Sequence, residues 1–252
     1  MNFVDAIDAP TRNTGEIKLY GIEGFEGMRR AGKLAAECLD MLVAHVQPGV
    51  TTAKLDDLAR EFVLERGGIP GAKTLKDGDI VNIDVTVIID GYHGDTSRMY
   101  SVGPVKRKSM RLMDVTYECM KRGIEAVKPG ARLGDIGAAI QEHAERQRYT
   151  VVEAFCGHGV GKVFHDAPNI LHFGKRGQGE ILQPGMIFTV EPMINLGRKD
   201  VALLADGWTA VTRDRSLSAQ YEHSCGVTET GVEIFTLSRA GLDSPHTLSP
   251  VV

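Results

Sequence analysis

Two parts of this amino-acid sequence repeat each other, and the repeat restricts the possible folds more than any other feature. The segment QPGVTTAKLDDLAREFVLERG, which starts at Gln47, resembles KPGARLGDIGAAIQEHAERQR, which starts at Lys128. Further along, LKDGDIVNIDV from Leu75 resembles LQPGMIFTVEP from Leu182. Because both pairs occur in the same order, we expect two related halves, each built from a pair of helices followed by strands.

The two halves differ in length between the repeated segments. In the first half 29 positions separate Pro48 from Asp77, whereas 55 positions separate Pro129 from Pro184 in the second half, a difference of 26. The longer interval contains CGHGVGKVFHDAPNILHF, which is rich in residues suited to chemistry, whereas the first half has only GGIPGAKT there. The repeat therefore marks a place near Gly68 where about 26 residues could be absent.

Composition indicates an ordinary soluble globular protein. The 252 residues are 42% hydrophobic and 25% charged, with a net charge of −4, which argues against a general binder of nucleic acids or anionic membranes. The four cysteines are scattered without a CxxC pair, which favours a reduced, cytosolic setting. The N-terminus lacks the apolar stretch of a signal peptide, and no apolar run approaches the roughly 18 residues that a membrane span needs.

Hydrophobic periodicity predicts where the helices and strands lie. From residue 23 to 46, apolar side chains recur every three or four positions, which predicts an amphipathic helix that ends before Pro48-Gly49. The same pattern predicts further helices at about 52–66, 109–127 and 133–147. Strand-like runs lie at 80–89 and 92–102, and strands dominate from the last helix to about residue 237. The expected fold class is therefore mixed α/β (α+β).

An Asp-Gly turn at 90–91 joins two strand-like runs, which is a strong β-hairpin signal. This turn pairs positions whose numbers sum to 181, so Asp95 lies opposite Thr86, on the face that carries Asp84. The two carboxylates are thus expected as diagonal neighbours. Considered alone, they could form a solvated face, but Asp84 lies in a Val- and Ile-rich run that we expect to be buried on both faces. Because a buried, unpaired carboxylate is costly, a metal site gains weight.

The stretch CGHGVGKVFH at 156–165 places two histidines in a glycine-rich frame. Glycines allow the backbone to turn tightly and to approach a ligand closely. His158 and His165 are seven positions apart, so on a straight strand they would face opposite sides, and only a bend between them lets them converge. A lone histidine is more often structural than a ligand, and this pair leaves both interpretations open.

Two glutamates lie inside apolar, strand-like runs. Glu191 belongs to IFTVEPM and occupies the position that Asp84 has in the repeat, and Glu222 belongs to SAQYEHSCGV. A pseudo-twofold axis between the halves would bring Glu191 and Asp84 together. His223, the neighbour of Glu222, should point to the opposite face of the sheet. The histidines that we interpret as structural or at the surface are His45, His143, His223 and His246.

These residues together form a candidate metal site made of Asp84, Asp95, His158, Glu191 and Glu222. Four carboxylates and one imidazole suit two divalent cations of hard to borderline character, such as Mn²⁺, Fe²⁺ or Co²⁺. Two such ions held roughly 3.5–4 Å apart can generate hydroxide and stabilise a tetrahedral intermediate.

Over nearly the whole chain, from about residue 17 to 237, the sequence resembles the type I methionine aminopeptidases. The resemblance rests on DGDIVNIDVTV, GYHGDTS, CGHGVGKVFHDAP, PGMIFTVEPM and DGWTAVTRDRSLSAQYEH. It implies the pita-bread fold, in which two halves related by a pseudo-twofold axis form an antiparallel sheet covered by helices. We place a single catalytic domain of this fold at 23–240, with a lead-in or tail at 1–22 and a C-terminal tail at 241–252.

The resemblance also implies an activity, namely removal of the N-terminal methionine from nascent proteins when the second residue is small. A hydroxide activated by two divalent ions (Co, Mn, Fe, Zn or Ni) would perform it. Asp84 would chelate one ion, and Asp95 and Glu222 would bridge both. His158 and Glu191 would bind the other ion, with Glu191 also acting as general base.

At the substrate, the same resemblance implies further roles. His165 would hydrogen-bond the substrate carbonyl and its tetrahedral intermediate, and Phe164 and Trp208 would form walls of the methionine pocket. Taken by itself, Trp208 would more simply be a packed core indole, but it follows Asp206-Gly207 as in the family pattern. We expect a cytoplasmic monomer that acts on N-terminal peptides near the ribosome, without direct binding to nucleic acid or membrane.

The sequence departs from the family pattern in the same interval that the repeat marks. The family has a segment with a Tyr-containing loop, a strand and a His-Gly pair before Ile-Pro, whereas here Gly67-Gly68 runs directly into Ile69-Pro70. A histidine near the scissile nitrogen and one wall of the pocket are absent with it. One alternative is therefore an impaired or non-catalytic protein of this fold that binds metal and peptide. Another is a proline-directed peptidase, which RSLSAQYEH disfavours, and the complete ligand set favours the aminopeptidase.

Restoring the absent segment should raise activity. We predict that inserting the family's segment between Gly68 and Ile69 raises kcat/KM toward a Met-Ala-Ser peptide roughly tenfold or more, because a positioned proton-transfer residue contributes about 10²–10⁴-fold. Steady-state kinetics of both proteins with added Mn²⁺ or Co²⁺ measures the difference. Equal values would mean that the segment is dispensable.

Overall fold

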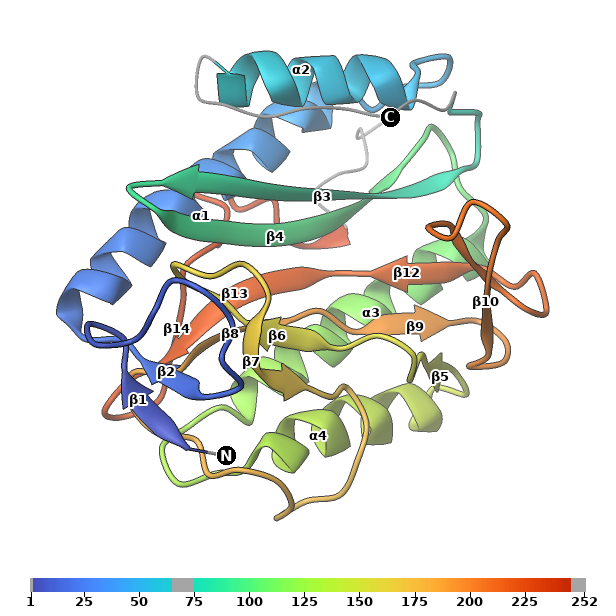
Figure 1. Ribbon diagram of the computed structural model, residues 1–252. Coiled ribbons are helices and arrows are strands. Elements are labelled where there is room, and N and C mark those ends of the chain that lie inside the picture. Colours follow the sequence, from blue (N-terminus) through green and yellow to red (C-terminus); the bar gives the residue numbers. More distant parts are fainter. Residues whose placement is uncertain (1, 65–74, 246–252) are drawn as a thin grey trace.

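A computed structural model describes residues 2–64 and 75–245, and Figure 1 shows its elements. The helices are α1 (Ile22–Leu42), the 3-10 helix η1 (Val43–His45), α2 (Thr52–Leu64), α3 (Arg107–Glu125) and α4 (Leu133–Arg146). The strands are β1 (Phe3–Asp5), β2 (Ile17–Leu19), β3 (Ile80–Ile89), β4 (Tyr92–Ser101), β5 (Thr150–Val151), β6 (Gly157–Gly159), β7 (Asp166–Ile170), β8 (Ile187–Val190), β9 (Met193–Asn195), β10 (Val201–Leu203), β11 (Ala210–Thr212), β12 (Ser218–Gln220), β13 (Glu222–Val227) and β14 (Val232–Ile234).

The predicted helices are confirmed, with ends that shift by a few residues. The α-helix predicted over 23–46 ends at Leu42 and continues as a 3-10 turn from Val43 to His45, shortly before Pro48-Gly49. The helix predicted over 109–127 begins and ends two residues earlier, at Arg107 and Glu125. The last residues of the helix predicted over 52–66 lie outside the described part of the chain.

The centre of the fold is an antiparallel sheet whose strands follow the order β3-β4-β13-β8-β6-β7, with β14 paired to β13. The repeated segments LKDGDIVNIDV and LQPGMIFTVEP supply β3 and β8, so these strands correspond, and β4 then corresponds to β13. The pseudo-twofold axis therefore passes between β4 and β13. The expected fold of two related halves is observed.

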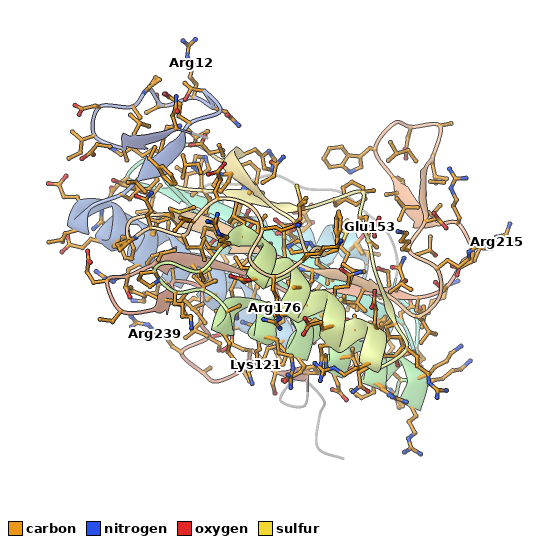
Figure 2. The ribbon with its side chains drawn as sticks, turned by 90° about the horizontal axis from the view of Figure 1, so that it is seen from below. Arg12, Lys121, Glu153, Arg176, Arg215 and Arg239 are labelled. Carbon is orange, nitrogen blue, oxygen red and sulfur yellow. The ribbon has the colours of Figure 1, made fainter. Side chains whose placement is uncertain are left out.

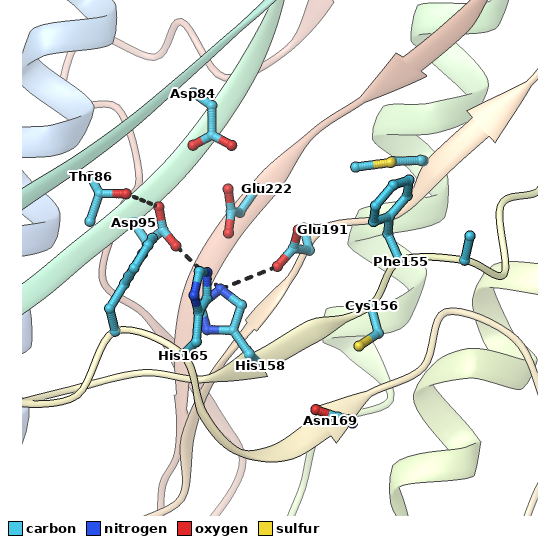
Figure 3. A pocket seen from close by; sticks show the side chains of 13 residues that line it. Asp84, Thr86, Asp95, Phe155, Cys156, His158, His165, Asn169, Glu191 and Glu222 are labelled. Atoms are coloured by element: carbon cyan, nitrogen blue, oxygen red, sulfur yellow. Dashed lines mark hydrogen bonds and ion pairs between the residues drawn. The ribbon is translucent and has the colours of Figure 1, made fainter. Parts of the chain in front are cut away.

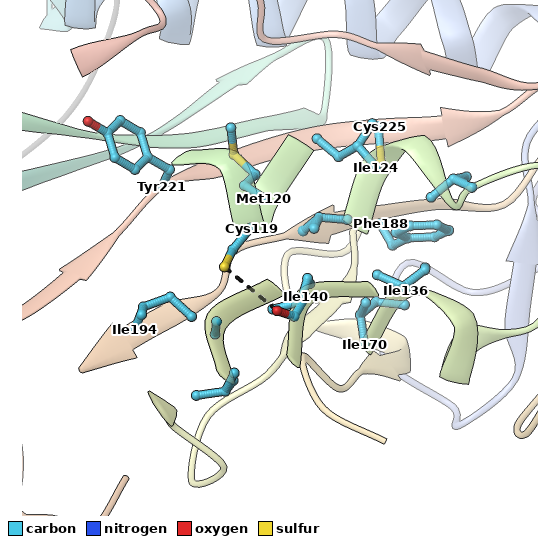
Figure 4. Packing of buried hydrophobic residues seen from close by; sticks show 14 of the residues in the cluster. Cys119, Met120, Ile124, Ile136, Ile140, Ile170, Phe188, Ile194, Tyr221 and Cys225 are labelled. Carbon is cyan, nitrogen blue, oxygen red and sulfur yellow. Dashed lines mark hydrogen bonds between the residues drawn. The ribbon is translucent and has the colours of Figure 1, made fainter. Parts of the chain in front are cut away.

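Each half covers the sheet with its own helices (Figure 1). Helix α1 packs on β3 and β4, whereas α3 packs on α4 and on β8. Behind the first hairpin, Leu39 of α1 belongs to one buried apolar cluster with Val85 of β3. Figure 4 shows the larger cluster of the second half, where Met120, Ile140 and Phe188 are fully buried. Apolar burial on this helix-covered face leaves the other face of the sheet free to carry polar groups.

The first hairpin has the predicted register. Asp84 pairs with Ser97, and Thr86 pairs with Asp95. The turn residue at 90 has φ 52° and Gly91 has φ 79°, and both are left-handed values, as the two central positions of a type I′ turn require. Asp84 and Asp95 are therefore diagonal neighbours on one face, as expected.

The expectation that β3 is buried on both faces is wrong. Val85 and Val87 are buried against α1, but Asp84, Thr86 and Ile88 are exposed, Ile88 by 59%. The physical reason is that helices cover only one face of this strand and that β3 is the edge of the sheet within the described residues. Its counterpart β8 is buried throughout and pairs with β6 on its outer side.

The first residues of the chain pack onto the second half instead of forming a free tail. Strand β1 pairs in parallel with β2, Ile17 is buried, and Leu19 forms a bridge with Met186 just before β8. Near the other end, Asp243 lies 3.4 Å from the guanidinium group of Arg98 on β4. The bounds 1–22, 23–240 and 241–252 for tails and domain stay predictions.

Charged side chains lie around the outside of the molecule, as Arg12, Lys121, Arg176 and Arg215 show in Figure 2. The cysteines Cys38, Cys119 and Cys225 are buried, and Cys156 is partly buried. Across residues 2–64 and 75–245, no helix combines the length and the apolar composition that crossing a lipid bilayer requires.

A glycine allows α1 to approach β4 closely. A Cβ atom on Gly94 would overlap the backbone of Ala31 and Gly32 in α1. We predict that Gly94→Ala lowers the free energy of unfolding by about 1–3 kcal/mol, because the helix has to move to admit the methyl group. Urea unfolding measures the loss. Gly231→Ala is the control, since a Cβ there meets no atom within 4 Å, and equal losses in both variants would refute this account.

Candidate metal centre

All five predicted metal ligands line one cavity of about 500 Å³. They come from different elements, namely β3, β4, β6, β13 and the residue that follows β8, and Figure 3 shows their side chains converging. The cavity is lined by Asp84, Thr86, Asp95, Ala154, Phe155, Cys156, His158, Phe164, His165, Asn169, Glu191, Met193 and Glu222. The structure thus brings together every residue of the predicted ligand set.

Strand register explains why the acids converge. Ser97 of β4 lies opposite Asp84 on one side and opposite Glu222 on the other, so these positions form a row across three strands on one face. Asp95 is two positions from Ser97 and points to the same face. On its far side β13 pairs with β8, and Glu191, which directly follows β8, joins the group. Four carboxylates therefore share one face of the sheet around the pseudo-twofold axis.

His158 faces these carboxylates with its Nε2 atom. Its Nδ1 lies 3.0 Å from the carbonyl oxygen of Gly159, and because a carbonyl only accepts, Nδ1 is the protonated nitrogen. Nε2 lies 3.5 Å from Asp95 Oδ2 and 3.6 Å from Glu191 Oε1. An imidazole lone pair that faces two carboxylates needs a proton or a metal cation between them. The orientation of the ring therefore fits a metal ligand.

Three of the residues are close enough to share one ion. The ligand atoms of Asp95, His158 and Glu222 all lie within 4.8 Å of one another. Asp95 and Glu222 are almost fully buried, with 4% and 2% exposed. Buried charges are normally paired or bound to a metal, and carboxylate and imidazole are ligands that suit divalent first-row metals. The residues present thus fit a divalent cation.

Burial, with a smaller contribution from neighbouring charges, raises the pKa values of three of the acids. Burial, followed by the charges of Asp95 and Glu191, raises the pKa of Asp84 to about 8. Asp84 keeps contact with solvent through the cavity mouth, but protein surrounds most of its carboxyl group. Burial raises the pKa of Glu191 to about 7, and burial and then the charge of Asp95 raise the pKa of Glu222 well above its usual range. A bound cation would relieve this repulsion and displace the protons.

Polar side chains that the sequence analysis did not assign to the site hold two of the acids. Thr86 Oγ1 donates to Asp95 Oδ1 at 2.7 Å, and Thr189 Oγ1 donates to Glu191 Oε1 at 2.7 Å. Gln220 Nε2 donates to the other oxygen, Glu191 Oε2, at 3.2 Å. Each threonine occupies a same-face position beside its acid, so strand alternation could have identified both.

Two buried histidines have structural roles. His223 points away from the cavity, as predicted, and its Nδ1 lies 2.9 Å from Thr236 Oγ1. His172 Nε2 accepts the backbone N–H of Glu191 at 3.1 Å, a contact for which the sequence held no signal. Burial lowers the pKa of each histidine to about 3, so both stay neutral. His45 is exposed and His143 half-buried, whereas His246 lies outside the described residues.

His165 and Phe164 line the cavity beside His158. The ring centroids of His158 and His165 are 4.5 Å apart, and those of Phe164 and His165 are 4.0 Å apart. The predicted bend between the histidines begins as a register shift between His158 and Gly159. Burial, and then the charge of His158, lower the pKa of His165. Its imidazole is therefore neutral near pH 7.

The structure does not place Trp208 at the cavity as expected, and it does not describe the short link. The Trp208 side chain is 88% exposed near the β10–β11 hairpin and is not part of the cavity lining. The structure does not bring it to the cavity, and its role as a pocket wall stays a prediction. The junction Gly67–Pro70 lies outside the described residues, so the proposed effect of the short link also stays a prediction.

Comparison with known proteins places the chain among metallopeptidases. Residues 66–229 match metallopeptidase family M24. Methionine aminopeptidase of Rickettsia prowazekii is 53% identical over 91% of this chain and 98% of its own length, and methionine aminopeptidase A of Synechocystis is 50% identical over 88% and 98%. The crystal structure of methionine aminopeptidase from Rickettsia prowazekii superposes with a TM-score of 0.85 over 88% of this chain and 100% of that chain.

The same alignments contain positions of the relatives that have no counterpart in this chain. The Rickettsia alignment spans 255 positions, yet 91% of 252 residues is about 229, so about 26 positions of that relative face no residue here. The methionine aminopeptidase of Escherichia coli, 46% identical over 92% of its own length, aligns over 244 positions with 86% of this chain, about 217 residues. About 27 positions are unmatched there. Both totals agree with the 26 residues by which the repeated halves differ.

Metal binding should depend on the acids of the cavity. We predict that Glu222→Gln and Asp84→Asn each remove most Mn²⁺ binding, because each variant loses a charged ligand. Titration calorimetry of the folded, metal-free proteins measures this. Asp90→Asn is the matched control, because Asp90 lies at the exposed hairpin turn and asparagine tolerates its positive φ. Undiminished Mn²⁺ binding by Glu222→Gln would contradict the assignment.

Proposed function

This chain belongs to the methionine aminopeptidases of metallopeptidase family M24, and we propose that it removes the N-terminal methionine of nascent proteins when the second residue is small. The observation that carries the proposal is the cavity in which four acids and His158 face one another beside His165. The chain spans 98% of the length of the Rickettsia relative, which supports an activity of the whole protein. Such an enzyme is a metalloexopeptidase.

The cavity would hold two divalent ions. Asp84 would bind one ion, Asp95 and Glu222 would bridge both, and His158 and Glu191 would bind the other. The support is the donor set of four carboxylates and one imidazole on converging strands, which suits Co, Mn, Fe, Zn or Ni. When bound, such ions polarise a carbonyl group and lower the pKa of a water molecule.

Glu191 would move the proton during peptide cleavage. Thr189 and Gln220 each hold one of its carboxylate oxygens, so the group has a fixed orientation at the cavity wall. A carboxylate held in this way can accept a proton from the attacking water and return it to the leaving amine. Restricting its rotation keeps it within reach of both partners.

His165 would act on the substrate carbonyl. Its neutral imidazole lines the cavity beside His158 and can donate a hydrogen bond to the oxygen on which negative charge develops. Phe155, Phe164 and Met193 also line the cavity and offer apolar surface for a methionine side chain. Trp208 would join this pocket only if the β10–β11 hairpin folded over the cavity.

A metal- and peptide-binding protein with impaired catalysis is the alternative. The observation in its favour is the set of about 26 positions of the Rickettsia relative that this chain lacks. The retained ligands and His165 favour the enzyme. We also propose a monomer that works in the cytoplasm near the ribosome, because nascent chains present their N-terminal methionine there first.

Turnover of short peptides tests the proposal. With added Mn²⁺ or Co²⁺, we expect methionine release from Met-Ala-Ser to exceed amino-acid release from Leu-Ala-Ser and Ala-Pro-Ser. His165→Ala should lower kcat by about 10²–10³-fold, because it removes a hydrogen-bond donor to the developing oxyanion. Its Mn²⁺ binding should persist, since His165 is not among the proposed ligands. Mn²⁺ binding without any turnover would favour the impaired alternative, and faster cleavage of the Leu or Pro peptides would exclude the proposed specificity.

A further inference from the structure

The chain segment that carries His165 depends on other parts of the molecule for its shape. Residues 161–165, here called the His165 loop, lie between β6 and β7 and form neither helix nor strand. The loop presents Phe164 and His165 to the cavity. A loop without regular hydrogen bonding needs external contacts to hold a side chain in one place.

Lys18 of β2 forms a buried ion pair with Asp166, the residue that follows His165. Lys18 Nζ lies 2.6 Å from Asp166 Oδ2, and the two side chains are only 4% and 3% exposed. Lys18 Nζ also donates to the carbonyl oxygen of Arg12 at 3.2 Å, and Asp166 Oδ1 accepts the N–H of Ala167 at 3.0 Å. Because loss of one partner would leave the other charge buried and unpaired, this ion pair fixes the end of the loop firmly.

Asn13 holds the loop at His165 itself. Its Nδ2 donates to the backbone carbonyl oxygen of His165 at 2.9 Å. Its Oδ1 accepts the N–H of Gly15 at 2.8 Å, which orients the amide group. The N-terminal segment therefore contacts His165 directly through Asn13 and the next residue through Lys18.

The start of the loop is fixed as well. The hydroxyl of Tyr20, also in the N-terminal segment, accepts the N–H of Lys162 at 3.2 Å. The backbone N–H of His93 on β4 donates to the carbonyl oxygen of Gly161 at 2.9 Å. The ring Nδ1 of His93 lies 2.9 Å from the same oxygen. The His93 ring stacks on Phe164 with centroids 5.6 Å apart. Both ends of the loop are thus attached to ordered parts of the fold.

We propose that Lys18 is a positioning residue for catalysis, which together with Asn13 holds the His165 loop so that the imidazole stays where it can meet the substrate carbonyl. The inference rests on the role that the proposed function assigns to His165. Lys18 is not among the residues that line the cavity, so it acts on the reaction only through the loop. The segment expected to be a lead-in would then support the active site.

A double-mutant cycle with Lys18→Met and His165→Ala tests this. The full-length proteins are assayed on Met-Ala-Ser at saturating Mn²⁺. We expect Lys18→Met to lower kcat roughly tenfold or more, with KM and Mn²⁺ affinity changed less than about twofold, and to have no further effect when His165→Ala is present. An unchanged kcat, or losses that multiply in the double variant, would overturn the proposal.

A second buried ion pair supplies the matched control. Arg98 Nη1 of β4 lies 2.8 Å from Asp40 Oδ1 of α1, so this pair does not join the N-terminal segment to the His165 loop. Any loss of activity in Arg98→Met should therefore multiply with that of His165→Ala. If Lys18→Met does not fold, Asn13→Ala enters the same cycle, because it removes one exposed hydrogen bond to the His165 carbonyl. Asn13→Ala must then lower kcat in the unaltered background and have no further effect when His165→Ala is present. Losses that multiply in the double variant would overturn the proposal.

Spectra of the metal-free protein separate this inference from the proposed function. In proteins with ¹⁵N-labelled histidine, Lys18→Met should shift the imidazole NMR signals of His165 and leave those of His223 unchanged. Unmoved His165 signals would overturn the positioning role. If the unaltered protein releases no methionine but Lys18→Met moves the His165 signals, the proposed function fails, whereas the inference that Lys18 holds the His165 loop in place stands. If the unaltered protein is active and Lys18→Met retains its full kcat, only the positioning role fails.

Discussion

Repulsion among four carboxylates in one cavity is the constraint on which this structure depends. Asp84, Asp95 and Glu222 share a sheet face because strand register puts them there, and Glu191 follows the adjoining strand. Like charges this close disfavour the arrangement. Apolar packing of the helices against the opposite face supplies the free energy that holds the strands together, and a bound divalent cation would remove the repulsion. Fold and metal therefore support each other.

Local and repeated signals explain what the sequence could predict. A two-residue Asp-Gly turn fixes hairpin register, and register decides which face each side chain takes, so the neighbourhood of Asp84 and Asp95 followed from counting. The repeat made Glu191 the equivalent of Asp84, and the sheet places both beside the pseudo-twofold axis. The length difference between the halves also agrees with the unmatched positions in the relatives.

Contacts between distant parts of the chain left no such signal. The Lys18–Asp166 pair joins residues 148 positions apart, and neither residue stands out by periodicity. The hydrogen bond from the Glu191 N–H to His172 likewise depends on the path of the chain after β7. For Trp208, the family pattern indicated a residue type at a position, but not how far its hairpin stands from the cavity. Apolar composition suggested burial of β3 on both faces, yet burial depends on what covers a strand.

Because the two halves are unequal, the two edges of the sheet differ. Beyond β8 lie β6 and β7, whereas within residues 2–64 and 75–245 no strand pairs with the outer side of β3. The ten-residue strand β3 is thus an edge strand within the described residues, with Ile88 exposed, and an edge of this kind can accept a strand from another molecule. Pairing at an edge strand depends on protein concentration, so an association of chains through β3 would strengthen as the concentration rises.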